Sequence, residues 1–186
     1  MNSPGKFEGL EFNDAFAREM WDYCHSDYDR STALVEGLSK GLWSGLSAEV
    51  AIKFMYVDPK FSDMVVKHIE AFAPEAHKEI ALNLIQRGHA DLLTQHVQDF
   101  QGLDLDVVKA CLAKAQVARL VFDHPEIFQG TEEDRKNPEF RPLVFDRSFA
   151  EKAMKADALE TLRHMSLFPE MSQDDFAGLF VSFNHK

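Results

Sequence analysis

Histidine is the residue whose type and spacing most directly suggest chemistry in this chain. Four histidines each stand four residues before an aromatic residue, at equivalent places in successive segments: His68, His96, His124 and His164. Such a ladder of imidazoles could bind a metal or an anion, or change charge between about pH 5 and 8. Packed helices, however, lie about 8–10 Å apart, whereas zinc ligands lie about 2 Å from the ion, so equivalent histidines cannot easily share one metal. We therefore expect a structural role, in which each ring satisfies carbonyl groups near a helix end.

A second group of reactive side chains lies closer to the N-terminus. Cys24 and His25 stand among the carboxylates of Asp22, Asp27 and Asp29. A thiol beside an imidazole could form a nucleophile with its base, or a pair of metal ligands. Adjacent residues of a helix point about 100° apart, so the pair cannot act together if the segment is helical. We interpret it as a polar hairpin turn.

The remaining candidate chemistry is sparse. The paired carboxylates Glu132/Glu133 and Asp174/Asp175 fit a solvated loop and the start of a helix. The sequence contains no phosphate-binding loop, zinc-protease motif or nucleophile elbow. It therefore favours a protein that is not an enzyme, and it predicts no catalytic residue, no cofactor and no metal site.

A recurring aromatic position defines the elements that carry the histidines. It repeats at intervals of about 28 residues, with insertions in two intervals, at Phe7, Trp43, Phe72, Phe100, Phe128 and Phe168. Two apolar residues usually lie three and four positions before each histidine, as in Met64/Val65, Leu92/Leu93 and Leu120/Val121. This spacing is helical. A preceding segment such as 49–55 or 79–85 has the same character, so each repeat is predicted to contain two helices.

Polar and glycine residues mark the predicted helix boundaries. Ser47, Asp104 and Ser172 stand where a first helix should begin. A glycine follows most of the recurring aromatics, where a left-handed residue would end the second helix: Gly9, Gly45, Gly102 and Gly130. Pro125 should end the preceding helix near Asp123 or His124.

These features predict an all-α chain, folded as an α-solenoid of about five stacked antiparallel helical hairpins. The stretch from His77 to Asp104, with its two helical segments and terminal Phe100-Gln101-Gly102, resembles HEAT-like and related short bacterial α-solenoid repeats. The resemblance implies scaffolding or partner binding and carries no catalytic motif. We predict a single repeat domain over residues 1–186, with its best repeats at 47–130, an inserted surface loop at 131–142 and a divergent last unit at 143–186.

Composition restricts the partners and the compartment. The chain has 31 acidic and 20 basic residues, a formal net charge of −11, so it should repel nucleic acid directly. Two widely separated cysteines fit a reducing compartment. The start of the sequence lacks a signal-peptide pattern, and no apolar run approaches the roughly 20 residues of a membrane span. We expect a cytoplasmic protein without membrane contact.

Three functions fit these features. The first is a non-catalytic repeat module that holds a protein partner, of unknown identity, through a curved acidic surface. The alternatives are an acidic inhibitor that mimics nucleic acid in a basic groove, and a helical-repeat enzyme with an unrecognised pocket. We also expect the solenoid ends to offer surfaces for a homo-oligomer, because a terminal stripe has no following repeat to cover it: Phe176, Phe180 and Phe183.

Overall fold

The computed structural model describes residues 12–23, 27–58 and 60–184, and this part of the chain is all-helical. It contains twelve α-helices and five short 3₁₀-helices (η), and no β-strand is found among the described residues. The all-α prediction is therefore confirmed here. The chain packs as two compact units that divide between Ile80 and Ala81. The single repeat domain predicted for 1–186 stays a prediction.

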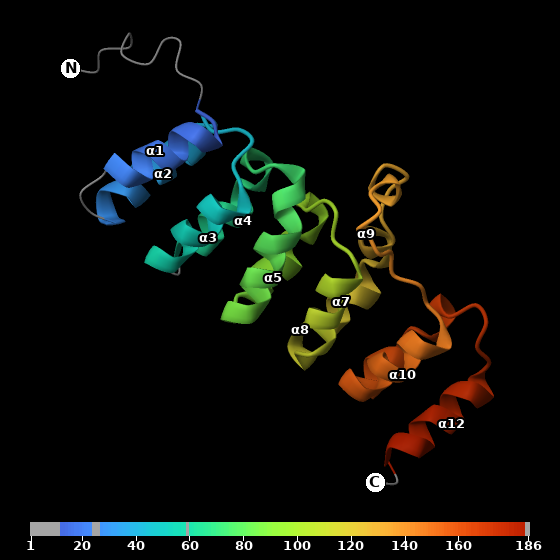
Figure 1. The fold of residues 1–186 in the computed structure, drawn as a ribbon. Helices are drawn as coiled ribbons and strands as arrows, with labels where there is room; N and C mark the ends of the chain where they lie inside the picture. The colour runs from blue at the N-terminus through green and yellow to red at the C-terminus, as the bar shows by residue number, and fades with distance from the viewer. Residues whose placement is uncertain (1–11, 24–26, 59, 185–186) are drawn as a thin grey trace. The chain divides into compact units, whose positions relative to one another are not determined.

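The first unit contains two pairs of helices and the connectors that follow them (Figure 1). Its elements are α1 (Asp14–Tyr23), α2 (Asp27–Ser39), α3 (Ala48–Val57), α4 (Lys60–Lys67), η1 (Ile69–Ala71) and η2 (Pro74–Ala76). α1 packs against α2, and α3 packs against both α4 and α2. Helices of about ten residues are marginal alone in water, so these packed apolar faces must stabilise them. α5 (His77–Arg87) begins in this unit and continues into the next.

In the second unit, pairs of helices follow one another, and the second helix of a pair is followed by a short helical turn. Its further elements are α6 (Ala90–His96), η3 (Val97–Asp99), α7 (Leu105–Leu112), α8 (Ala115–Asp123), α9 (Pro125–Gln129), η4 (Asp134–Lys136), α10 (Arg147–Ala156), α11 (Ala158–Arg163), η5 (Met165–Leu167) and α12 (Gln173–Asn184). α7 packs against α8, and α10 packs against α11. Contacts of α8 with α11 and of α10 with α12 join consecutive pairs.

The predicted helix starts are confirmed by side-chain caps. The side-chain oxygens of Ser47, Asp104 and Ser172 each accept a backbone N–H of the first turn, at 3.4, 2.9 and 3.3 Å respectively. Asp146 and Asp157 do the same for α10 and α11, at 2.7 and 2.9 Å. Such caps satisfy amides that have no partner within the helix.

The second helices end before the recurring aromatic residue, which the sequence predicts only for α8, through Pro125. Each one breaks at the recurring histidine, where φ lies between −134° and −109° and ψ between 13° and 54°: His68, His96, His124 and His164. A 3₁₀-helix or a single α-turn follows, and the tighter winding of a 3₁₀-helix turns the chain toward the aromatic residue. α8 ends at Asp123, as the position of Pro125 predicts. The glycines therefore do not end these helices, except Gly130 after α9.

Five of the recurring aromatic residues belong to the core, and Phe7 lies outside the described residues. These five are no more than 4% exposed: Trp43, Phe72, Phe100, Phe128 and Phe168. The ring of Trp43 lies 5.2 Å from that of Phe12, between centroids. In the second unit, Phe168 contacts three further rings at 5.2–5.9 Å, those of Phe145, Phe149 and Phe176. The glycines two residues after three of these aromatics have φ of 64–70°, the left-handed conformation that the sequence predicts: Gly45, Gly102 and Gly130.

The inserted segment 131–142 is mostly exposed, and its end returns to the helices. The Leu105 N–H donates to the Arg141 carbonyl, and the Leu143 N–H donates to the Phe128 carbonyl, both at 2.8 Å. These backbone bonds hold the end of the insertion beside α7, where Leu105 lies, and beside α9, where Phe128 lies. Within the described residues, no helix is both long and apolar enough to cross a bilayer.

The close packing of Trp43 against α2 leads to a prediction about stability. Gly37 is buried in α2, and a Cβ there would lie 2.0 Å from the indole nitrogen of Trp43. We expect Gly37→Ala to lower the free energy of unfolding by about 1–3 kcal/mol, despite the better helix propensity of alanine. Gly178 of α12 has no such neighbour, so Gly178→Ala should stabilise by about 0.5–1 kcal/mol. Urea denaturation measures both, and stabilisation by Gly37→Ala would contradict the packing.

The burial of His77 leads us to expect that the stability of the fold depends on pH. Its side chain is 1% exposed, its Nε2 lies 3.3 Å from the Phe72 carbonyl, and burial lowers its pKa. The folded chain therefore binds fewer protons than the unfolded chain, whose histidine pKa is about 6.5. Burial of the neutral His77 side chain therefore contributes fully to the free energy of unfolding above about pH 6.5. This contribution is lost as the pH falls below that value. His77→Gln should flatten the decline in urea midpoint between about pH 7 and 5, whereas a variant that keeps the wild-type decline would refute this assignment.

Candidate functional site

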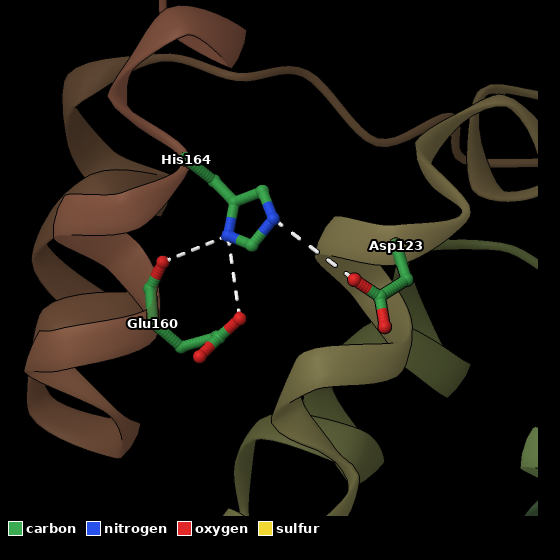
Figure 2. Close-up of side chains that lie close together, drawn as sticks. All are labelled: Asp123, Glu160 and His164. Atoms are coloured by element: carbon green, nitrogen blue, oxygen red, sulfur yellow. Dashed lines mark hydrogen bonds and ion pairs between the residues drawn. The ribbon is translucent and has the colours of Figure 1, made fainter.

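A compact polar cluster lies between two helices of the second unit. It consists of Asp123, at the end of α8, with Glu160 of α11 and His164, which follows α11 (Figure 2). His164 Nε2 lies 3.9 Å from Asp123 Oδ1, and His164 Nδ1 lies 3.6 Å from Glu160 Oε1. One potential ligand atom from each residue lies within 4.8 Å of the other two. We call this set the DEH cluster.

Local helix geometry positions these three side chains. Asp157 caps α11 and places Glu160 in its first turn. His164 stands four residues after Glu160, so both side chains lie on one face of the helix. Asp123 is the last residue of α8, which packs against α11. The cluster therefore depends on the packing of two successive helix pairs.

The imidazole of His164 is oriented by two contacts. Its Nδ1 lies 2.9 Å from the backbone carbonyl of Glu160 and therefore donates a proton to it. The Phe122 ring stacks on the imidazole, with centroids 5.3 Å apart and an interplanar angle of 11°. In the neutral ring, Nε2 then carries the lone pair, and it faces Asp123 (Figure 2).

Two arginines bind the outer oxygens of the carboxylates. Arg119 Nε donates to Asp123 Oδ2, and Arg163 donates to Glu160 Oε2, both at 3.0 Å. Each carboxylate thus keeps one oxygen directed toward His164. Glu160 Oε1 also lies 3.9 Å from Arg119 Nε. The arginines balance the carboxylate charges and fix their orientation.

Glu160 occupies a position that is apolar in the preceding repeats. Four residues before the other histidines stand Met64, Leu92 and Leu120. Glu160 is nevertheless 7% exposed, and its neighbour Thr161, at another normally apolar position, is fully buried. A buried carboxylate is costly unless it is paired. This departure is therefore a specific feature of the last helix pair.

The other recurring histidines have local partners. His68, His96 and His124 place Nδ1 at 3.6, 3.3 and 3.7 Å from Glu70, Asp99 and Glu126, which follow them by two or three residues. All four histidine side chains are 25–28% exposed. His164 also contacts an acidic residue of the preceding helix pair, Asp123, which lies 3.9 Å from its Nε2. The proposed structural role of these histidines stays a prediction.

The remaining sequence candidates do not form a reactive site in the described residues. The group around Cys24 and His25 lies outside the side chains that the structure describes. Cys111 is buried, and burial raises the pKa of its thiol to about 12, which makes it a poor nucleophile. Glu133 pairs with Lys136 in the exposed insertion. Asp175 accepts from Ser172 at the start of α12.

The terminal stripe is divided between core and surface. Phe176 is 1% exposed and packs against Phe168, so it belongs to the core of the second unit. Phe180 is 40% exposed. The ammonium group of Lys155 lies 5.2 Å from the centroid of Phe183. Of the stripe, Phe180 is therefore the residue most available to another molecule.

A groove of approximately 520 Å³ lies on the second unit, between the end of the insertion and the connector after η5. Its apolar lining includes Pro142, Val144, Leu167 and Pro169. Along this segment, Leu143 and Phe145 are 2% and 8% exposed, whereas Val144 is 61% exposed. Arg135, Asp146 and Glu170 supply charge around the groove. We call it the insertion groove.

Neither feature follows from the sequence pattern. Asp123 is separated from Glu160 by α9, the insertion and α10, so no local spacing connects them. The available signal was the replacement of an apolar pair by Glu160/Thr161. The groove depends on how the end of the insertion folds back, which periodicity does not indicate.

Comparisons with family models, with curated proteins and with solved structures give no match.

The burial of Glu160 leads to a stability prediction. Glu160→Leu restores the apolar residue of the earlier repeats and removes the buried charge. We expect its free energy of unfolding to be equal to that of wild type or higher by about 1 kcal/mol. Glu160→Ala leaves a void and should lower it by about 2–4 kcal/mol. Guanidinium denaturation compares the two variants, and a loss for Glu160→Leu as large as that for Glu160→Ala would show that the ion pairs themselves stabilise the fold.

Proposed function

We propose that this chain is a non-catalytic helical-repeat module that binds a protein partner. The observation that carries the proposal is the insertion groove, in which a largely exposed valine, Val144, stands between two buried neighbours. An apolar surface with a few charged groups at its edge is typical of a site that binds another molecule. Its volume of about 520 Å³ suits a few side chains of a partner.

The chemistry of the groove indicates the character of the partner. Proline, valine and leucine side chains would bury apolar residues of the partner, and Glu170 would attract a basic one. The net charge of −11 acts in the same direction, because it favours association with a basic surface. We therefore propose a partner segment that combines apolar and basic residues.

The recurring elements support a repeat architecture for this module. The pairs α3/α4, α7/α8 and α10/α11 each contain two packed helices, a break at a histidine and a buried aromatic residue. A single helical hairpin cannot bury its apolar face alone, so neighbouring hairpins stack. We propose that about five such hairpins form an α-solenoid related to HEAT-like repeats, and that the insertion supplies its binding surface.

A charge in the groove tests the proposal. Val144 and Leu159 are 61% and 65% exposed, but only Val144 lines the groove. We expect Val144→Asp to reduce partner recovery at least about tenfold, since it introduces a charge that must be desolvated on binding. Leu159→Asp should leave recovery unchanged. Affinity capture from extract of the cells that produce the chain, with quantitative mass spectrometry, measures both.

Two results would contradict this function. One is the absence of any partner that distinguishes wild type from Val144→Asp. The other is an equal loss for Val144→Asp and Leu159→Asp, because a nonspecific apolar contact would respond to both.

A further inference from the structure

We propose that the DEH cluster is a divalent transition-metal site, with zinc as its best-suited ion, that joins α8 to α11. Its ligands are one imidazole nitrogen of His164 and one carboxylate oxygen each of Asp123 and Glu160. The sequence predicts no metal because equivalent histidines are too far apart to share an ion. This set needs only one histidine, and it does not depend on the insertion groove or its partner.

The distances suit such an ion. Zinc lies about 2.0–2.2 Å from imidazole nitrogen and carboxylate oxygen, so two ligand atoms on different sides of it are at most about 4 Å apart. His164 Nε2 and Asp123 Oδ1 are 3.9 Å apart. One ligand atom from each of the three residues lies within 4.8 Å of the other two. Glu160 Oε1, which lies 3.6 Å from His164 Nδ1, must turn toward Nε2 to complete the set. Three protein ligands leave a fourth position for water.

The outer contacts are those that metal ligands require. A ligating histidine almost always donates its other N–H to a carbonyl or carboxylate, which fixes its tautomer. His164 does so through Nδ1, to the Glu160 carbonyl at 2.9 Å. Ligating carboxylates are also held by hydrogen bonds. Arg163 and Arg119 hold the outer oxygens of Glu160 and Asp123.

The burial of Glu160 also favours a cation at this place. Glu160 replaces an apolar residue of the earlier repeats and is 7% exposed. Its Oε2 accepts from Arg163 at 3.0 Å, and its Oε1 lies 3.6 Å from His164 Nδ1 and 3.9 Å from Arg119 Nε. A buried carboxylate is costly unless opposite charge compensates it, and a cation between Glu160, Asp123 and His164 would add to that compensation.

The arginines also limit the affinity. Two guanidinium groups already balance two carboxylates, so the ion enters a set without net negative charge. We therefore expect a dissociation constant in about the micromolar range, weaker than that of a closed site with four protein ligands.

Calorimetric titration of the tag-free full chain with zinc chloride tests the site at about pH 7.5, where free histidine is mostly neutral. We expect one ion per chain, and His164→Ala should weaken binding at least about tenfold. His96→Ala is the matched control, since His96 is 28% exposed and pairs with Asp99 on its own segment. It should bind zinc as wild type does. Circular dichroism confirms the folding of each variant.

Asp123→Asn gives a second test if His164→Ala does not fold, because it alters an exposed ligand on the other helix. Zinc should also raise the midpoint of thermal unfolding of wild type, since it binds only the folded chain, and should not raise that of Asp123→Asn. Failure of wild type to bind zinc, equal binding by wild type and both ligand variants, or tighter binding of magnesium than of zinc would each overturn the proposal.

Discussion

Burial of the recurring aromatic residue is the interaction on which the rest of this structure depends. Its α-helices in the described residues have 5–13 residues, too short to be stable alone, so each pair needs apolar packing at its end. Burying one phenylalanine side chain contributes about 1.5–3 kcal/mol. Trp43 in the first unit and Phe168 in the second each pack against further rings. The break at each histidine serves this packing, because it turns the chain inward after the second helix.

The same packing places the polar groups that could act on other molecules. α8 and α11 contact each other, and this contact brings Asp123 to Glu160 and His164. The end of the insertion is held by backbone bonds to Leu105 and Phe128, and it presents Val144 at the groove. Function in this chain is therefore proposed at two departures from the repeat: a buried carboxylate in an apolar position, and an added segment between helix pairs.

The sequence predicts what depends on local spacing. The helix starts at Ser47 and Asp104, the left-handed glycines and the buried aromatics follow from capping, backbone conformation and period, and the structure confirms them. The breaks at His68, His96 and His164 were missed because a 3₁₀-helix and an α-helix have nearly the same side-chain pattern over three residues. The DEH cluster and the groove require contacts between segments far apart in the chain, which a period of about 28 residues cannot specify.

The central claim is that this chain holds a protein partner through the insertion groove. Site-specific photo-crosslinking tests it most directly: a photoreactive amino acid replaces Val144 in one protein and Leu159, equally exposed on α11, in another. The account predicts that position 144 crosslinks to one protein, through a segment rich in apolar and basic residues, and that position 159 does not. No crosslinked protein at position 144, or the same products from both positions, would contradict it.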